Sequence, residues 1–342
     1  MSTTVDRAAK QTGTKFERVL ARIRDGAAPQ RYSDIADALK IPADEVVRIV
    51  DSLVAGGMNI NVGRSGVELF HTLPIIRHES INIKSMKGTH HVYGVTADNH
   101  LGSKYSRLDV INALFDIWVD RGVKTVLQCG NIIDGECRFN KHDLLVHGME
   151  EQVDYLIQNW PHRKGIVTEF VTGDDHEGWY VQREGVDIGR YIEMKAVQAG
   201  RHDLQYKGHM ERQVAYIARG NKSTLSQLHA GGGTAYAISY TSQKQVESYQ
   251  PGEKPTIILV GHYHKFDYSF PRAVHAIQPG CTEDQSPFMR KRRIEAMIGG
   301  VTLEFDLDGR ALVNNVGVMW HPFYDRDFYN GKLWKYRWNE KP

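Results

Sequence analysis

The chain has 342 residues, of which 41% are hydrophobic and 25% are charged, the proportions of an ordinary soluble protein. This composition excludes a disordered tail, a collagen-like repeat and a coiled coil, and the length predicts two domains. A net charge of +2 gives no overall attraction to nucleic acid, so any such binding must come from local patches. The sequence has no long apolar run and no apolar leader, and its three cysteines form no CxxC pair. We therefore expect a cytoplasmic protein without membrane association.

Three helices and a hairpin are predicted near the start of the chain. Apolar residues recur at spacings of three and four from Lys15, and this spacing returns in two further segments that end at Gly56-Gly57. Two short strands then flank the turn at residues 63–66. This order predicts a winged helix-turn-helix domain over residues 15–72, in which the third helix would contact DNA.

The charge of this third predicted helix argues against strong DNA binding. It carries Asp44, Glu45 and Asp51 against the single Arg48, whereas a helix that faces phosphates is normally basic. Two roles stay open for the domain: DNA binding, or packing, dimerisation and contact with another protein.

Residues 73–90 form a predicted linker, with an alternating segment that could instead be an edge strand. Short apolar strands then alternate with helices over residues 91–318, which predicts a large α/β domain. Residues 319–342 form an aromatic-rich C-terminal extension. Three roles stay open for this extension: packing on the core, contact within a homodimer, or stacking on single-stranded nucleic acid.

Polar side chains follow five predicted strands at the point where each strand ends. Because the carboxyl ends of parallel strands meet at one edge of a sheet, we expect these side chains to converge. Nitrogen and oxygen donors without thiolates suit manganese, iron, zinc or nickel. The segments are Asp98-Asn99-His100, Gly130-Asn131, Gly173-Asp174-Asp175-His176, His229 and Gly261-His262-Tyr263-His264.

This ordered set resembles the motifs of the calcineurin-like metallophosphoesterases, which are DxH, GDxxD, GNH(D/E), a lone histidine and GHxH. The resemblance covers roughly residues 91–310. It implies a four-layer αββα sandwich, in which two mixed β-sheets face each other and helices cover their outer faces. It also implies two divalent metal ions. Manganese is the first candidate for these ions, and iron, zinc and nickel are the alternatives.

The resemblance implies a role for each residue of the motifs. His176 corresponds to the non-ligand histidine beside the scissile phosphate, where it would assist attack by a metal-activated hydroxide. Asn131 corresponds to the ligand that bridges the two ions. The first ion would be held by Asp98, His100 and His264, and the second by Asp175, His229 and His262.

The chain departs from the family pattern at two positions. Asn131 stands where the family has its bridging aspartate, and Asp175 stands where the family has a ligand asparagine. The number of carboxylates is preserved, but an amide oxygen is a poor bridge between two cations. Either Asp175 leans across to bridge them or the first ion is held weakly, and a site with one ion or none is the alternative. Asp134 and Asp174 are further carboxylates close by.

The GDDHEGW segment and the winged-helix-like module resemble phage and prophage-encoded members related to DNA-repair exonucleases. We therefore predict a phosphodiesterase that depends on two metal ions. Its first candidate activity is that of a DNA nuclease, with nucleic acid as the substrate. Two alternatives stay open: a hydrolase for a small phosphodiester or phosphomonoester such as a cyclic nucleotide, and a non-catalytic scaffold that binds DNA or a partner. Trp179 and Tyr180 could stack on a base or pack in the core, and Arg290–Arg293 could bind phosphates or be solvated.

Overall fold

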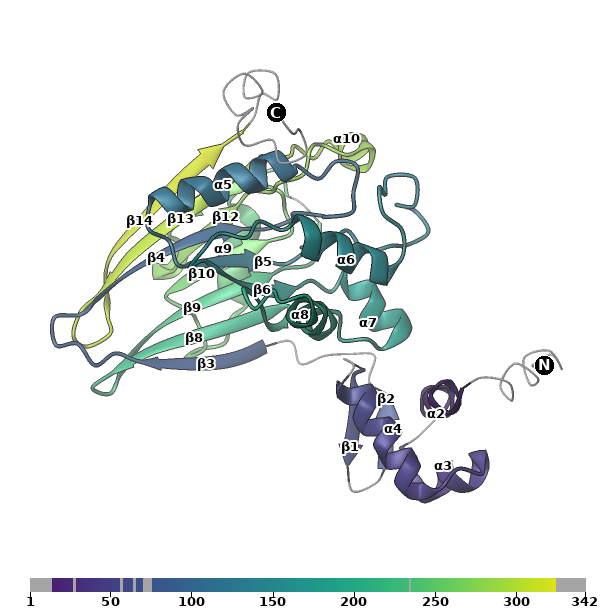
Figure 1. The fold of residues 1–342 in the computed structure, drawn as a ribbon. Helices are drawn as coiled ribbons and strands as arrows, with labels where there is room; N and C mark the ends of the chain where they lie inside the picture. Colours follow the sequence, from purple (N-terminus) through teal and green to yellow (C-terminus); the bar gives the residue numbers. More distant parts are fainter. Residues whose placement is uncertain are drawn as a thin grey trace. The chain divides into compact units, whose positions relative to one another are not determined.

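The computed structural model describes residues 14–26, 29–55, 58–63, 66–69, 76–233 and 235–323 (Figure 1). In these parts of the chain, no helix is both long and apolar enough to cross a membrane. Residues 73–75 of the predicted linker and residues 324–342 of the predicted C-terminal extension lie outside the described residues.

The chain divides into two compact units. The first comprises Met1–Leu73 and Tyr180–Met194, and the second comprises Pro74–Trp179 and Lys195–Pro342. Two helices cross the boundaries between these segments, α7 (Gly178–Glu184) and α8 (Ile188–Gln198).

Three helices and a hairpin pack around one apolar core in the first unit. The hydroxyl of Thr14 accepts a hydrogen bond from the backbone of Glu17, whose carboxylate accepts one from the backbone of Thr14, and this capping box begins the first helix. The core includes Val19, Ile35, Val50 and Val67. The elements follow the predicted order, and their assignment as a winged helix stays a prediction. They are α2 (Lys15–Arg24), α3 (Tyr32–Leu39), α4 (Ala43–Ala55), and the antiparallel strands β1 (Ile60–Gly63) and β2 (Gly66–Leu69).

Six strands form the first sheet of the second unit, in the order β14-β13-β4-β5-β6-β7. Strands β4 to β7 run parallel to one another, and β13 pairs antiparallel with both β4 and β14. The strands are β4 (Thr89–Thr96), β5 (Thr125–Cys129), β6 (Val167–Thr172), β7 (Leu204–His209), β13 (Gly299–Leu307) and β14 (Val313–Pro322).

The second sheet also has six strands, in the order β11-β12-β10-β9-β8-β3. Strands β9, β10 and β12 are parallel, whereas β8 runs antiparallel to β9. The edge strand β3 lies within the predicted linker and pairs parallel with β8. The strands are β3 (Ile76–Asn82), β8 (Glu211–Ala218), β9 (Asn221–His229), β10 (Ile257–Gly261), β11 (Phe266–Ser269) and β12 (His275–Pro279).

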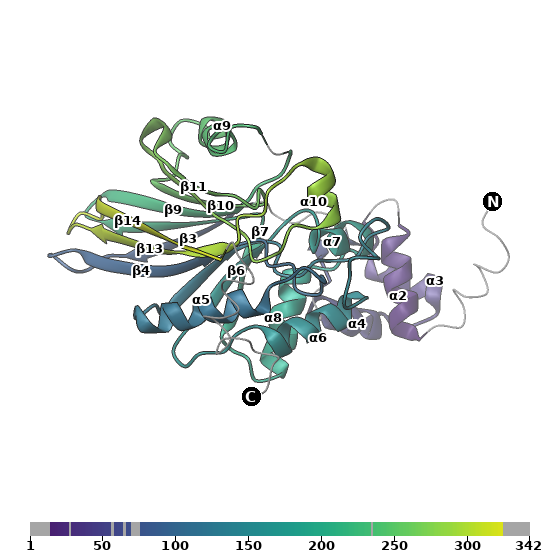
Figure 2. The ribbon, with the colours of Figure 1, turned by 90° about the horizontal axis from the view of Figure 1, so that it is seen from above.

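The two sheets face each other across an apolar core, and helices cover their outer faces (Figure 2). Val95 and Leu127 of the first sheet share this core with Leu225 and Leu259 of the second. Helices α5 (Leu108–Asp120) and α6 (Met149–Asn159) lie outside the first sheet, and α9 (Tyr240–Ser248) lies outside the second. The predicted arrangement of two sheets between helices is therefore confirmed.

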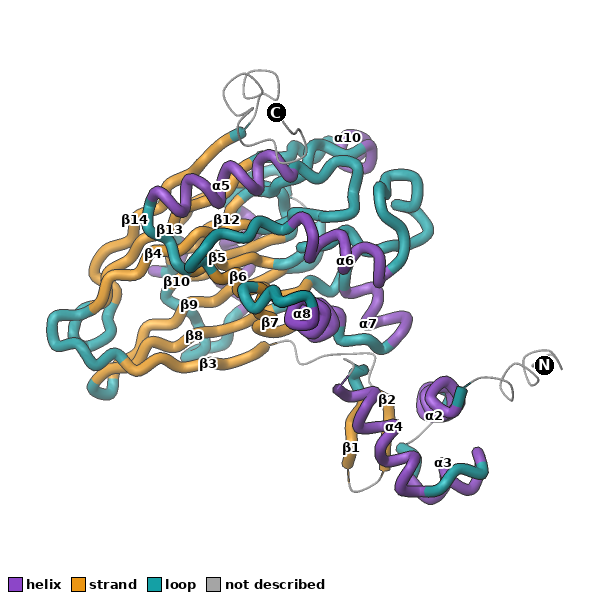
Figure 3. The backbone as a smooth tube through the Cα atoms, viewed as in Figure 1, coloured by secondary structure: helices purple, strands orange, loops and turns teal. Residues whose placement is uncertain are grey.

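The loops that follow β4, β5, β6, β9 and β10 lie at the same end of the two sheets (Figure 3). The register explains why, because Cys129 at the end of β5 pairs with Val171 near the end of β6, and His229 at the end of β9 pairs with Gly261 at the end of β10. A short helix η1 (Pro271–Ala273) precedes β12, and α10 (Pro287–Arg292) follows it. The sandwich thus gathers the predicted motifs at one end.

The contact between Gly94 and Trp118 makes a prediction about the stability of the sandwich. A β-carbon at Gly94 in β4 would lie 2.5 Å from the indole ring of Trp118, which is buried on α5. We expect Gly94→Ala to lower the free energy of unfolding by about 1–3 kcal/mol through overpacking, as measured by urea denaturation. Gly317→Ala in β14 is the control, because its nearest neighbour atom lies 3.8 Å away. Equal effects of the two changes would contradict this account.

Candidate metal centre

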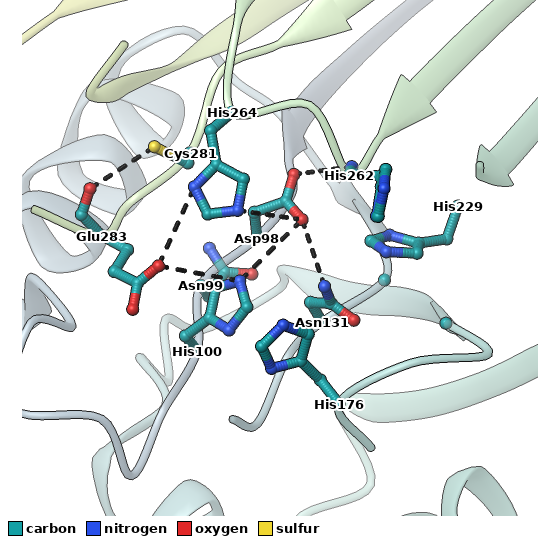
Figure 4. A network of polar contacts seen from close by, with 12 residues as sticks. Asp98, Asn99, His100, Asn131, His176, His229, His262, His264, Cys281 and Glu283 are labelled. Carbon is teal, nitrogen blue, oxygen red and sulfur yellow. Dashed lines mark hydrogen bonds and ion pairs between the residues drawn. The ribbon is translucent and has the colours of Figure 1, made fainter. Parts of the chain in front are cut away.

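Three groups of side chains among the described residues could hold a metal ion, and the third, His100, Asp134 and His176, shares His100 with the first. Figure 4 shows the first group and the two histidines of the second. In the first cluster, Oδ1 of Asp98 lies 4.0 Å from Nε2 of His100 and 3.8 Å from Nε2 of His264. In the second, the two oxygens of Asp175 lie 3.5 Å from Nε2 of His229 and 3.4 Å from Nδ1 of His262. Within each cluster the three ligand atoms lie within 4.8 Å of one another. The first and second groups are the two ligand sets that the motifs predicted.

Three of the histidines are oriented by a hydrogen bond from the ring nitrogen that faces away from the cluster. Nδ1 of His100 donates to Asp134 at 2.8 Å, Nδ1 of His229 to the carbonyl of Cys129 at 2.7 Å, and Nε2 of His262 to the carbonyl of Gly232 at 2.7 Å. Such partners fix the tautomer and leave the other nitrogen as an acceptor. The other nitrogen of each ring therefore points into its cluster, where His229, whose pKa is raised, would lose its proton when a cation binds.

Several of these ligand atoms are buried and have no hydrogen-bond partner among the described residues. They are Nε2 of His100 and Oδ1 of Asn131, together with Oδ1 of Asp175 and Nε2 of His229, which form only a 3.5 Å ion pair with each other. A buried polar atom without a partner costs about 1–3 kcal/mol, so such atoms rarely gather in one place without a function. A divalent cation in each cluster would satisfy them, and the residues present therefore fit the metal ions that the motifs imply.

The backbone of the site is strained. A left-handed conformation costs a residue with a side chain about 1–3 kcal/mol. Residues in this conformation concentrate at functional sites, where the surrounding structure holds the backbone in place. Sequence patterns gave no signal of this strain. The site residues with φ between 50° and 95° are Asp98, His100, Asn131, His176, His262 and His264.

The charges in the clusters favour cation binding. Burial, with a smaller effect from the neighbouring His100, lowers the pKa of His264 to about 3, so this ring is neutral. Burial alone would raise the pKa of Asp175, but its contacts with His229 and His262 hold that pKa far below the usual range. Burial would lower the pKa of His229, but the carboxylates of Asp175 and Asp98 raise it to about 9. The second cluster thus holds a proton that a metal ion could replace.

Asn131 lies between the two clusters. Its amide nitrogen is 3.4 Å from Oδ1 of Asp98 in the first cluster. Its amide oxygen faces Gly173, where a β-carbon would lie 2.8 Å from that oxygen and 2.6 Å from the ring of His229 in the second cluster. In this orientation the amide oxygen lies on the side of the second cluster and the amide nitrogen on the side of the first.

His176 lies beside the first cluster without belonging to either ligand set. Its Nδ1 donates to the backbone carbonyl of Asp134 at 2.8 Å, and its ring contacts that of His100 with a centroid distance of 4.4 Å. Burial alone would lower the pKa of His176, but the charge and hydrogen bond of Asp134 raise it to about 10. The ring is therefore protonated, the form required of a proton donor.

Three carboxylates near the site had no role in the motifs, and their contacts show what each one does. Asp134 orients His100 and His176, whereas Asp174 is exposed and lies 3.6 Å from His209, outside both ligand sets. The sequence gave no role to Glu177, which is buried and accepts hydrogen bonds from the backbone of Asn131 at 2.8 Å and of Gly173 at 2.9 Å. Glu177 therefore ties together the loops that follow β5 and β6.

No protein-family model matches the chain, and no curated protein does. Among solved structures, an archaeal phosphodiesterase is 13% identical, with 67% of this chain and 99% of that one covered and a TM-score of 0.33. A 5'-nucleotidase precursor from Thermus thermophilus is 12% identical over 72% of this chain and 58% of that one, with a TM-score of 0.35. Vps29 from Entamoeba histolytica, in complex with zinc, is 14% identical over 68% and 98%, with a TM-score of 0.31. Likenesses this weak establish neither the family nor the activity of this chain.

The second cluster predicts that Asp175 is a stronger determinant of metal binding than Asn131. Asp175 contacts both histidines with a full negative charge, whereas Asn131 offers a neutral oxygen. We expect Asp175→Asn to weaken Mn²⁺ binding at one of two sites by at least ~10-fold, and Asn131→Ala to weaken it less. Isothermal titration calorimetry of the two variants measures the difference. Parent-like binding by Asp175→Asn would show that Asp175 is no ligand.

Proposed function

We propose that this protein is a metal-dependent phosphodiesterase that cleaves nucleic acid, with DNA as its first candidate substrate. The observation that carries the proposal is the pair of clusters with unpartnered ligand atoms, set beside a protonated histidine in a single cavity of about 870 Å³. His100, Asn131, Asp175 and His176 all line this cavity. Its volume lies within the range of small-molecule sites and suits a nucleotide unit.

Each part of the site has a distinct chemical task in this proposal. Two divalent ions, manganese in first place, would stabilise negative charge on the phosphate oxygens and activate a water molecule. His176 faces the same cavity, and its hydrogen bond to the carbonyl of Asp134 fixes the ring. Its second nitrogen can then donate a proton to the oxygen that leaves phosphorus. Asp134 keeps both His176 and His100 in place.

Exposed aromatic rings at the rim of the cavity favour nucleic acid over a small phosphate ester. Phe139 and Phe288 line the cavity with 74% and 57% of their surface exposed. Trp179 stacks on His176 with a centroid distance of 4.8 Å and contacts Phe139. Arg292 also lines the cavity, and its guanidinium lies 5.8 Å from the centre of the Phe288 ring. Aromatic rings beside a cation are a common way to hold single-stranded nucleic acid.

The first unit gives less support for binding to duplex DNA. In α4, the exposed Arg48 is paired with Asp44 at 2.6 Å, and Glu45 is paired with Lys15 at 2.7 Å. A cation that is already neutralised contributes little to phosphate binding. We therefore propose that this unit contacts a protein or a second copy of the chain. We also propose that the enzyme acts in the cytoplasm.

The role given to His176 predicts the outcome of its removal. We expect His176→Ala to reduce the Mn²⁺-dependent hydrolysis of bis-nitrophenyl phosphate by about 10²-fold or more, because the leaving oxygen loses its proton donor. The affinity for Mn²⁺ should stay unchanged, since His176 is in neither ligand set. His142→Ala removes an exposed histidine and is the control. If the parent protein with Mn²⁺ shows no hydrolysis, the protein is a scaffold rather than an enzyme.

The exposed aromatic rings at the rim of the cavity predict a preference for single-stranded DNA. We expect Phe288→Ala to raise the KM for single-stranded DNA by about tenfold or more, since stacking on one base contributes about 1–3 kcal/mol. The KM for bis-nitrophenyl phosphate should not change. Tyr268→Ala is the matched control, because Tyr268 is an exposed aromatic residue of β11 outside the cavity. Equal turnover of cyclic nucleotides, short strands and long strands would instead favour a hydrolase of small phosphate esters.

A further inference from the structure

Helix α10 and the residue that ends it carry four consecutive basic residues, at the end of the two sheets where the metal clusters lie (Figures 1 and 2). All four residues are exposed. Only Arg292 has a role in the proposed function, because it lines the cavity. The four residues are Arg290, Lys291, Arg292 and Arg293.

The position of α10 relative to the cavity is fixed by the fold. The hydroxyl of Ser286 caps the helix by accepting a hydrogen bond from the backbone of Met289 at 3.3 Å, and Met289 is buried. Both of these residues line the cavity. The preceding loop is fastened to the first cluster, since the backbone of Thr282 donates to that of Asp98 at 3.2 Å. The basic residues are therefore held beside the cavity rather than on a separate surface.

None of the four basic side chains has a carboxylate within ion-pair distance in the part of the chain that the structure describes. The acidic residues nearest in sequence are engaged elsewhere, because Asp284 is paired with Arg107 at 3.0 Å and Glu295 with Lys265 at 3.6 Å. The exposed arginine of α4, by contrast, is already neutralised. Unpaired cations that lie close together repel one another, and a bound polyanion would relieve this repulsion.

The spacing of residues on α10 places an aromatic ring beside two of the cations. Phe288 lies three residues before Lys291 and four before Arg292, and residues at these spacings share one face of a helix. The Phe288 ring is exposed and can stack on a base, which a single strand presents more readily than a duplex. Arg290 is already engaged, because its Nε donates a hydrogen bond to Oε1 of Gln285 at 3.2 Å.

We propose that Lys291 and Arg293, together with Arg292, bind the phosphates of a single-stranded nucleic acid that neighbour the one at the metal clusters. This inference rests on the proposed nuclease function. One base of the strand would stack on Phe288, and the neighbouring phosphates would lie on α10 outside the cavity. The substrate is then a strand of several nucleotides rather than a single phosphate ester.

The salt dependence of binding tests this assignment. The probe is a fluorescent oligothymidine of about 16 nucleotides with phosphorothioate linkages, which keep the charge of each phosphate and resist cleavage. Its affinity for the full-length chain with Mn²⁺ is measured by anisotropy over a range of salt concentrations. Each phosphate contact on a single strand contributes about 0.7 to the slope of log affinity against log salt concentration. We expect Lys291→Gln with Arg293→Gln to reduce this slope by about 1.4.

Two control variants separate the position of the charges from their number and from folding. Arg219→Gln with Lys222→Gln removes the same charge from the turn between β8 and β9, at the end of β9 opposite His229, and should keep the slope of the parent. Lys291→Arg with Arg293→Lys keeps both charges and should also bind like the parent. If the double glutamine variant does not fold, as judged by circular dichroism, the two single variants take its place and should each reduce the slope by about 0.7.

The outcomes separate this inference from the proposed function. A parent-like slope in the double glutamine variant, or an equal loss in the control at the β8–β9 turn, would overturn the role of α10, and cleavage of DNA by the parent would still stand. Tighter binding of a blunt duplex than of the single strand would overturn the choice of ligand. A parent that neither binds nor cleaves DNA would overturn both the role of α10 and DNA as the substrate.

Discussion

The hydrogen bond from Nδ1 of His229 to the carbonyl oxygen of Cys129 joins the carboxyl ends of the two sheets. His229 ends β9 in one sheet and Cys129 ends β5 in the other, so this bond fixes the distance between the loops that carry the two clusters. Three glycines make it possible. A β-carbon at Gly130, Gly173 or Gly261 would lie 3.0 Å or less from atoms of the His229 ring. The site can therefore be assembled only where backbone without side chains surrounds a buried imidazole.

The groups that would bind a cation lower the free energy of unfolding of the chain. Buried ligand atoms without partners and left-handed backbone at Asp98, Asn131 and His264 each raise the free energy of the folded chain. A cation that binds only the folded state offsets this cost in proportion to its concentration and affinity. Apolar residues of similar volume would have packed the same space without strain. The arrangement therefore makes sense as a binding site rather than as a structural feature.

Local patterns predicted the inner strands and the convergence of polar residues at their ends, whereas the two-sheet sandwich and the two ligand sets were implied by the resemblance of the ordered motifs. Apolar runs mark the inner strands. A polar residue that directly follows a parallel strand lies at the carboxyl edge of the sheet. The edge strands β7, β11 and β14 were not predicted, and the edge strand β3 was foreseen only as an alternative to a linker, because edge strands carry no continuous apolar run. The positions of Glu177 at the site and of Glu283 beside it could not be predicted either. Their positions depend on hydrogen bonds between loops far apart in the sequence, which no spacing of residues reveals.

The exchange of aspartate and asparagine between positions 131 and 175 redistributes negative charge between the two clusters. From the motifs alone, the exchange moves negative charge to the second site and leaves the first site deficient. In the structure, both Asp175 oxygens face histidines of the second cluster, at 3.5 Å and 3.4 Å, so Asp175 does not lean across to the first cluster. A shared carboxylate would couple the two ions, because its position depends on both. Because neither Asn131 nor Asp175 offers a carboxylate to both clusters, the spacing of the clusters depends on the loops that Glu177 ties together.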